Sequence, residues 1–145
     1  MSILSTDKVK LNAVVKDKEE AIRIAGQLLV NAGHVDPSYV DSMLERESSL
    51  STFMGGGLAI PHGTAEAKGS IKSTGLSIVQ LPEGVDFGEG NIAHLVIGIA
   101  AVGDDHLDIL TNVAMICSDD DNMEQILKAA TPEQMIQIFE SGMEE

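Results

Sequence analysis

The sequence has a single cysteine, Cys117, among its 145 residues. One cysteine excludes a disulfide bond within the chain and a metal cluster built from cysteine ligands. Cys117 ends the run Leu-Asp-Ile-Leu-Thr-Asn-Val-Ala-Met-Ile-Cys, whose apolar spacing is typical of a helix. We therefore expect a small buried thiol rather than a reactive one.

Long apolar runs are also missing. No apolar segment approaches about 18 residues, so the sequence predicts no membrane-spanning helix. The first residues, Met-Ser-Ile-Leu-Ser-Thr-Asp, lack the basic region and apolar stretch of a signal peptide, and we expect a cytoplasmic protein. With 43% hydrophobic and 22% charged residues, a chain of this length suits one globular domain with its own core.

Basic residues are scarce in the second half of the chain. From Glu83 to the C-terminus, 14 acidic residues accompany one basic residue, Lys128, whereas the first 82 residues carry 9 acidic and 8 basic ones. This balance, with a net charge of -14, disfavours binding to nucleic acid. The acidic half could steer basic protein partners, although solubility alone explains it equally well.

Helix and strand signals alternate in the first half. Residues 8–15 begin with an alternating pattern that predicts a strand. Asp17 followed by Glu20 is a capping-box pattern, and apolar residues at helical spacing continue to Gly33. The Asp-Pro pair at 36–37 predicts the start of a second helix.

The second half repeats this alternation. Residues 73–81 and 92–101 predict two strands, and the second is apolar enough to be central in a sheet. The turn-rich connection 82–90 is expected to be a surface loop. A helix opening at 103–105 should turn one apolar face inward, and shorter helices should follow from Asp121 and Thr131. The expected inward residues are Leu107, Leu110, Val113, Ala114 and Cys117. Strands interleaved with helices predict a single α/β domain.

The segment around His62 is expected to hold this histidine in a fixed, accessible position. The glycines at 55–57 allow backbone angles closed to other residues, and the apolar residues 58–60 anchor a short extended segment in the core. Pro61 stiffens the chain, so His62 is presented at the end of a rigid arm. Gly63 adds no side chain there, which would leave room for a second molecule. The alternative is that His62 is an ordinary turn residue.

The other three histidines differ in context. His34 lies in a turn and is expected to be a solvated loop residue, and His94, near the start of an apolar strand, is expected to be structural. His106 falls in the first turn of a predicted helix, where the helix dipole favours an anion and keeps the imidazole neutral. A plain surface position on a helix cap is the alternative for His106.

Arg46 lies at the edge of an apolar helix face, because Tyr39, Met43, Arg46 and Leu50 step by four, three and four residues. A guanidinium beside apolar neighbours is costly unless an anion meets it. Either Arg46 binds an anionic ligand, or Glu45, Glu47 or another carboxylate satisfies it, or its stem reaches water.

Several motifs that identify enzyme classes are absent. The sequence has no His-Glu-x-x-His metal site, no Gly-x-Ser-x-Gly nucleophile turn, no Walker loop and no paired glycines of a dinucleotide site. A nucleophilic histidine with possible anion-binding helpers remains. This combination suits a group carrier.

Short motifs in a fixed order resemble one family across nearly the whole chain. They are Lys18-Glu19-Glu20-Ala21-Ile22, Tyr39-Val40, Met43, Arg46-Glu47, Ala59-Ile60-Pro61-His62-Gly63-Thr64, Glu66-Ala67-Lys68, Pro82-Glu83-Gly84-Val85 with Phe87-Gly88, and Leu95-Val96-Ile97-Gly98-Ile99-Ala100-Ala101. Together they resemble the mannitol-type enzyme IIA domains of the bacterial phosphoenolpyruvate-dependent sugar phosphotransferase system. The Pro-His-Gly-Thr and Glu-Ala-Lys pieces look more like the mannitol class than the fructose or nitrogen-regulatory classes.

The resemblance implies that residues 1–145 form one such domain, an α/β fold with a mixed β-sheet flanked by helices on both faces. It also implies that His62 is phosphorylated, with His106 and Arg46 as its companions; Thr64 is a further candidate for contact with the phosphoryl group. We expect no cofactor and no metal, because the donor bond is already energetic and positioning with charge stabilisation could suffice. The family's upstream partner is the phosphocarrier protein HPr, and its downstream partner is a cysteine of a mannitol-specific IIB domain.

The sequence departs from the family pattern at two positions, Asp86 and His94, where a basic or neutral residue and an arginine are expected. Two other functions stay open. A regulatory module would use a phosphohistidine as a signal that a partner reads in one state only. A metal hydrolase would use His62, His106 and an aspartate.

Overall fold

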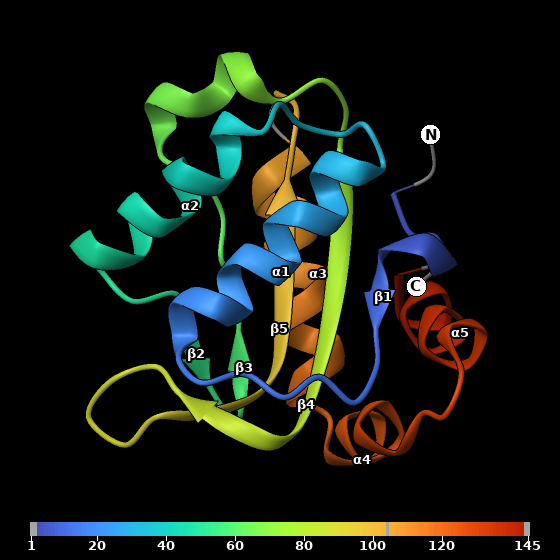
Figure 1. Cartoon of the computed structure of the whole chain (residues 1–145). Helices are drawn as coiled ribbons and strands as arrows, with labels where there is room; N and C mark the ends of the chain where they lie inside the picture. The colour runs from blue at the N-terminus through green and yellow to red at the C-terminus, as the bar shows by residue number, and fades with distance from the viewer. Residues whose placement is uncertain (1–2, 104, 144–145) are drawn as a thin grey trace.

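The computed structural model describes residues 3–103 and 105–143. Within these residues, five strands form one mixed sheet in the order β1-β4-β5-β3-β2 (Figure 1). They are β1 (Val9–Lys10), β2 (Phe53–Gly55), β3 (Leu58–Ala59), β4 (Gly75–Asp86) and β5 (Ile92–Ala100). The pairs β4–β5 and β2–β3 are antiparallel, whereas β1 runs parallel to β4 and β3 runs parallel to β5. The predicted α/β fold with a mixed sheet is confirmed.

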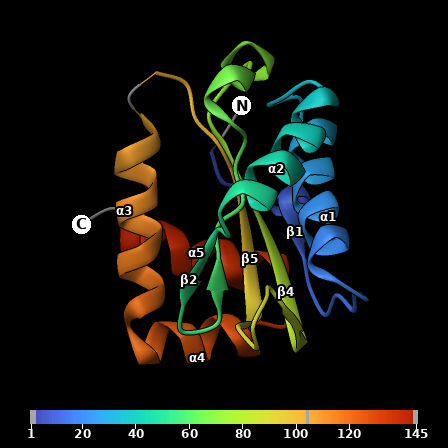
Figure 2. The same ribbon diagram turned by 90° about the vertical axis from the view of Figure 1, so that its left-hand side faces the viewer.

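Helices cover both faces of the sheet (Figures 1 and 2). One face carries α1 (Lys18–Asn31) and α2 (Ser38–Ser49). The other carries α3 (Asp105–Ser118), α4 (Asp120–Lys128) and α5 (Pro132–Met143). Among the described helices, none has the length and apolar character needed to cross a membrane.

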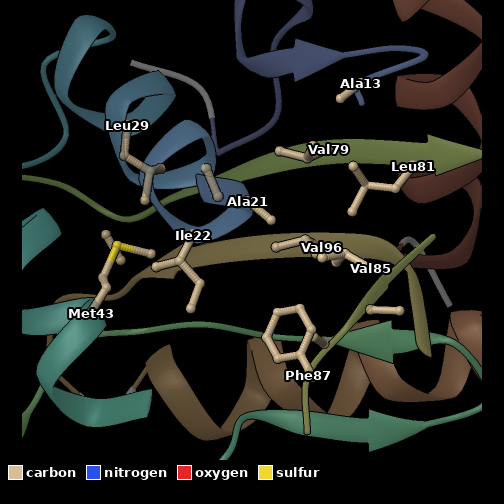
Figure 3. Packing of buried hydrophobic residues seen from close by; sticks show 14 of the residues in the cluster. Ala13, Ala21, Ile22, Leu29, Met43, Val79, Leu81, Val85, Phe87 and Val96 are labelled. Carbon is tan, nitrogen blue, oxygen red and sulfur yellow. The ribbon is translucent and has the colours of Figure 1, made fainter. Parts of the chain in front are cut away.

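Alternate residues of the central strand β5 enter two different cores. Val96 packs into the cluster under α1 and α2, whereas Leu95 and Ile97 pack into the cluster under the three C-terminal helices. Figure 3 shows Ile22 of α1 and Met43 of α2 closing over the first cluster. Because side chains alternate along a strand and both faces are covered, β5 is almost continuously apolar, as its sequence predicted.

Two helix starts follow their sequence signals. The Asp17 carboxylate accepts a hydrogen bond from the Glu20 backbone N–H at 2.9 Å. The Glu20 carboxylate reaches back to the N–H of Lys16, one residue earlier than a standard capping box requires. At α5, the Thr131 hydroxyl accepts from the Gln134 N–H at 3.2 Å. These caps satisfy backbone donors that have no partner within the helix.

Two strand predictions were wrong in extent. The strand expected over 8–15 is only the two residues of β1, since a 3-10 turn, Thr6–Lys8, precedes it and Asn12 has a positive φ of 53°. The loop expected over 82–90 is shorter than predicted, because β4 continues to Asp86. A register shift between Gln80 and Val85 interrupts the ladder there. A proline is tolerated at such an irregularity, where the ladder does not need its missing N–H.

The inward face of α3 was predicted only in part. Leu107 is 72% exposed, and Ile109 is buried instead. Val113 and Cys117 are buried as expected, and burial raises the pKa of the Cys117 thiol to about 12. The prediction that the Cys117 thiol is buried is therefore confirmed, and its lack of reactivity stays a prediction. Asp104, part of the predicted helix opening, lies outside the described residues.

The prediction of a solvated His34 was wrong. His34 and Lys8 are each 1% exposed, and Lys8 Nζ lies 2.6 Å from His34 Nε2. His34 Nδ1 lies 2.8 Å from the Ser73 hydroxyl. Burial lowers the pKa of Lys8 to about 8, and burial together with the Lys8 charge lowers the pKa of His34. A turn sequence gives no sign that a lysine 26 residues earlier will meet the ring.

Candidate functional site

His62 follows β3 and lies beside the end of β5. It forms an isolated parallel bridge with Ile99, and the Ile99 N–H donates to the Pro61 carbonyl at 3.0 Å. The His62 side chain is half-buried. The segment is therefore fixed to the sheet while His62 stays partly exposed, which agrees with the predicted rigid arm.

A backbone carbonyl sets the tautomer of His62. Nδ1 lies 2.9 Å from the carbonyl oxygen of Ile60. A carbonyl oxygen only accepts hydrogen bonds, so Nδ1 carries the proton and the neutral ring keeps its lone pair on Nε2. The ring is therefore prepared to act as a nucleophile through Nε2 without first losing a proton.

Two hydroxyls of α2 hold the residues after His62. The Tyr39 hydroxyl accepts from the Gly63 N–H at 2.9 Å and donates to the Ile99 carbonyl at 2.8 Å. The Ser42 hydroxyl accepts from the Thr64 N–H at 2.8 Å and lies 3.0 Å from the Thr64 hydroxyl. Burial raises the pKa of Tyr39, which keeps its hydroxyl protonated and able to donate. Neither hydroxyl was predicted to have this role.

Gly63 has an intramolecular reason for lacking a side chain. A Cβ atom there would lie 2.5 Å from Cε1 of Tyr39 and 3.0 Å from the Ser42 hydroxyl oxygen. The interpretation that Gly63 leaves room for a second molecule was therefore wrong. The glycine lets α2 approach the histidine segment closely enough for both hydroxyl contacts.

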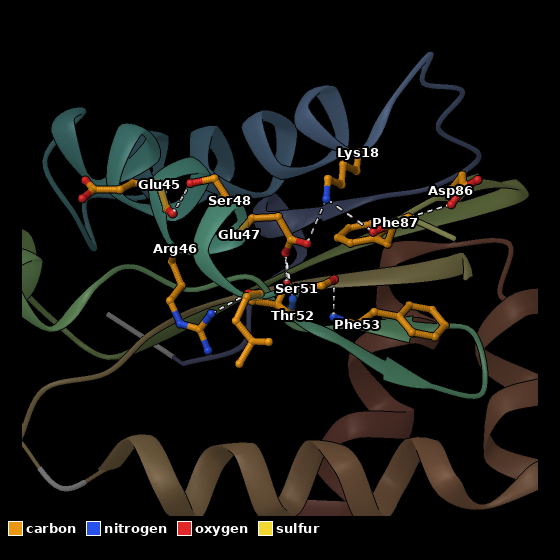
Figure 4. Close-up of polar contacts among 12 residues, drawn as sticks. Lys18, Glu45, Arg46, Glu47, Ser48, Ser51, Thr52, Phe53, Asp86 and Phe87 are labelled. Atoms are coloured by element: carbon orange, nitrogen blue, oxygen red, sulfur yellow. Dashed lines mark hydrogen bonds and ion pairs between the residues drawn. The ribbon is translucent and has the colours of Figure 1, made fainter. Parts of the chain in front are cut away.

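Arg46 lies on α2 one turn after Ser42, on the same helix face. Its Nη1 donates to the carbonyl of Leu50 at 2.6 Å and so caps the end of the helix (Figure 4). Among the described residues, Arg46 has no carboxylate within ion-pair distance. The alternative that Glu45 or Glu47 neutralises Arg46 was therefore wrong.

The neighbouring residue, Glu47, is buried and fully engaged elsewhere (Figure 4). Its Oε1 accepts from the N–H and the hydroxyl of Thr52 at 2.9 and 2.6 Å, and its Oε2 lies 3.3 Å from Lys18 Nζ. Burial alone would raise the pKa of this carboxyl, but hydrogen bonds from Thr52 and Ser51 and the charge of Lys18 outweigh it, and the pKa is lowered. From the sequence, Glu47 was expected only as a possible partner for Arg46.

The other residues singled out from the sequence are Thr64, His106 and His94. Thr64 is joined to Ser42, as described above. The backbone of His106 lies in the first turn of α3, as predicted, but its side chain lies outside the described part of the structure. His94 is structural, since its Nδ1 lies 3.1 Å from the Leu81 carbonyl. No group of three or more His, Cys, Asp and Glu residues that could hold a metal is found among the described residues.

The fold and the site together define a domain with a half-buried histidine at the edge of a helix-covered mixed sheet, its Nδ1 held by a backbone carbonyl. A family model described as "Phosphoenolpyruvate-dependent sugar phosphotransferase system, EIIA 2" matches residues 2–142. The chain belongs to this family.

Relatives and solved structures resemble the chain over almost its full length. The "Mannitol-specific phosphotransferase enzyme IIA component" of Geobacillus stearothermophilus is 52% identical over 139 residues, which are 96% of each chain. The Bacillus subtilis protein of the same name is 50% identical, over 96% of this chain and 97% of its own. The crystal structure of IIA mannitol from Escherichia coli has a TM-score of 0.87 and 39% identity, and covers 94% of this chain and 98% of that one.

A second solved structure shows such a domain with a partner. It is the complex of enzyme IIA mannitol and phosphorylated enzyme IIB mannitol from Escherichia coli. Its matching chain has a TM-score of 0.89 and 38% identity, over 95% of this chain and 97% of that chain.

Proposed function

We propose that residues 1–145 are one enzyme IIA domain that carries a phosphoryl group on His62 during mannitol uptake. The group arrives from a phosphohistidine of HPr and leaves to a cysteine of a mannitol-specific IIB domain. The name of relatives that are 52% and 50% identical supports the sugar, and the Escherichia coli complex supports the acceptor. The main observation that supports this role for His62 is the hydrogen bond from its Nδ1 to the Ile60 carbonyl.

The proposed mechanism of phosphoryl transfer follows from this hydrogen bond, which leaves the lone pair of His62 on Nε2. The Nε2 lone pair attacks phosphorus in line, so the new N–P bond forms as the N–P bond of the donor breaks, and the donor imidazole leaves. The His62 ring gains positive charge as it reacts. The Ile60 carbonyl, already 2.9 Å from Nδ1, stabilises that charge without moving. In the second step a thiolate of the acceptor attacks the same phosphorus, and His62 leaves as the neutral tautomer that it began as.

Three side chains are proposed to stabilise the oxygens of the phosphoryl group. Arg46 uses one N–H for the Leu50 carbonyl, and a guanidinium has others for an anion. His106 would donate from the first turn of α3, where the helix dipole also favours an anion. The Thr64 hydroxyl is the third. Each charge-assisted hydrogen bond contributes about 1.5 to 3 kcal/mol.

The test is phosphorylation of the purified protein. Incubation with phosphoenolpyruvate, enzyme I and HPr should add one acid-labile phosphoryl group, measured by intact mass. The His62→Gln variant should not accept it, whereas the matched variant His94→Gln should accept it normally. Phosphorylation of His62→Gln would remove His62 from the mechanism. The phosphorylated protein should then donate to a mannitol-specific IIB domain faster than to a fructose-specific one; equal rates would remove the assignment of mannitol.

A further inference from the structure

A continuous set of hydrogen bonds joins the buried Glu47 to the ring of His62. Glu47 Oε1 accepts from the Thr52 N–H and hydroxyl, at 2.9 and 2.6 Å. The Thr52 carbonyl accepts from the Ile60 N–H at 3.0 Å. The Ile60 carbonyl accepts from His62 Nδ1 at 2.9 Å. We infer that Glu47 is a positioning residue, which holds the Ile60 carbonyl where it fixes the tautomer of His62.

The strand pairing explains why the position of Thr52 matters. Phe53 pairs with Ala59 in the antiparallel ladder of β2 and β3, so the bond between Thr52 and Ile60 continues that ladder by one step. A carbonyl at the end of a ladder is less constrained than one inside it. Glu47 fixes the Thr52 end, because both partners are only 4% exposed and the carboxylate takes two donors from one residue.

Glu47 also has a purely stabilising contact, and the two can be separated. Its other oxygen, Oε2, lies 3.3 Å from Lys18 Nζ, which also donates to the Phe87 carbonyl at 3.3 Å. This ion pair ties α1 and the β4–β5 turn to α2 but does not touch Thr52. Removal of Lys18 should therefore cost stability and leave His62 unaffected.

The experiment compares Glu47→Ala, Glu47→Gln and Lys18→Met by two readouts. The first is the imidazole nitrogen chemical shifts of His62 by NMR at neutral pH, which report the fraction of each tautomer. The second is the rate of phosphoryl transfer from phosphorylated HPr. Folding of each variant is checked by backbone amide spectra. The transfer readout rests on the proposed function, whereas the tautomer readout does not, so failure of one is distinguishable from failure of the other.

We expect Glu47→Ala to convert His62 from the Nδ1–H form to a mixture of tautomers and to slow transfer by about tenfold or more. Glu47→Gln retains a carbonyl oxygen that can accept from Thr52, and it should keep the tautomer and stay within about threefold of the original rate. Lys18→Met should lower the unfolding midpoint but change neither readout. If Lys18→Met shifts the tautomer as much as Glu47→Ala does, general loosening is responsible and the inference is overturned.

A second variant covers the case in which Glu47→Ala does not fold. Thr52→Val removes only the hydroxyl bond to Glu47 and preserves both the shape of the side chain and the Thr52 carbonyl. It should shift the tautomer in the same direction, by a smaller amount. An unchanged His62 tautomer in a folded Glu47→Ala or in Thr52→Val would remove Glu47 from the positioning of His62.

Discussion

At the scale of single residues, the contact between Lys8 and His34 shows how burial controls protonation. Water is excluded from both side chains, so each loses the solvation that stabilises its charged form. Lys8 Nζ also donates to the Ile3 carbonyl at 2.7 Å, which ties the N-terminal segment to this site. Two adjacent groups that both become positive cannot be charged together at low cost, so this pair should make stability depend on pH.

We predict that stability rises with pH above about 8 because of Lys8. Its pKa is about 8 in the folded protein against 10.5 for an ordinary lysine. Between these values the unfolded chain binds more protons, so the free energy of unfolding increases with pH, by at most about 3 kcal/mol. Urea unfolding from about pH 7.5 to 9 measures it. Above that range the buried Cys117 thiol, whose pKa is raised to about 12, loses its proton only in the unfolded chain and opposes the rise. Lys8→Met should abolish the rise, and the exposed control Lys10→Met should retain it; a rise that persists in Lys8→Met would contradict the assignment.

Arg46 has two roles whose loss can be measured apart. Arg46→Ala should slow phosphoryl transfer by about tenfold or more, since about 1.4 kcal/mol corresponds to one decade in rate. It should also lower stability by roughly 1 kcal/mol, because the Leu50 carbonyl loses its side-chain partner. Arg46→Lys preserves the charge and should recover part of the rate. If Arg46→Ala transfers the phosphoryl group as fast as the original protein, Arg46 has no role in transfer and only caps the helix.

At the scale of elements, α1 and β5 approach each other closely at Gly98. A Cβ atom there would lie 2.5 Å from the Ser77 hydroxyl oxygen and 3.2 Å from Cβ of Ala25. The Ser77 hydroxyl cannot turn away freely, because it donates to the Ala25 carbonyl at 2.7 Å. Gly98→Ala should therefore lower the free energy of unfolding by about 1 to 3 kcal/mol, measured by urea unfolding.

Gly69 supplies the matched control for that change. A Cβ atom at Gly69 meets nothing within 4 Å, and its backbone needs no positive φ. Gly69→Ala should be neutral or slightly stabilising, since alanine restricts the unfolded chain. A loss of stability at Gly69 equal to that at Gly98 would mean that the close packing of α1 on β5 is not the cause.

Elements whose signals are local could be predicted from the sequence, and those that depend on distant partners could not. The caps at Asp17 and Thr131 are formed within four residues, and both were predicted. The extension of β4 through Pro82 to Asp86 depends on pairing with β5, which turn-forming residues conceal. Likewise, nothing near Leu107 in the sequence shows that Ile109 would be the residue turned toward the sheet.

The same distinction holds for the candidate site. The rigid presentation of His62 could be predicted because glycine and proline act on their own backbone. The hydroxyls of Tyr39 and Ser42 could not be assigned, since they reach Gly63 and Thr64 across more than 20 residues of sequence. Glu47 was considered only as a partner for Arg46. Its partner Lys18 lies 29 residues earlier on another helix, and the contact with Thr52, five residues later, carries no sequence motif.

At the scale of the whole molecule, the dominant feature is a net charge of -14 on 145 residues. Like charges on one compact surface repel each other and favour the unfolded chain. The exposed ion pairs Lys72–Asp36 and Lys128–Glu124 act in the opposite direction, but such pairs contribute little, about 0 to 1 kcal/mol each. Repulsion should therefore outweigh them.

Salt should consequently stabilise this protein. Between roughly 20 and 200 mM NaCl the screening length falls to about 10 Å or less, so repulsion among separated carboxylates weakens. The thermal midpoint should rise across this range. Glu140→Lys should raise the low-salt midpoint and flatten its dependence on salt, because Glu140 is exposed in the last turn of α5, where the helix dipole disfavours a negative charge. A midpoint that falls with salt would show that the ion pairs, including the partly buried pair of Lys18 and Glu47, outweigh the net charge.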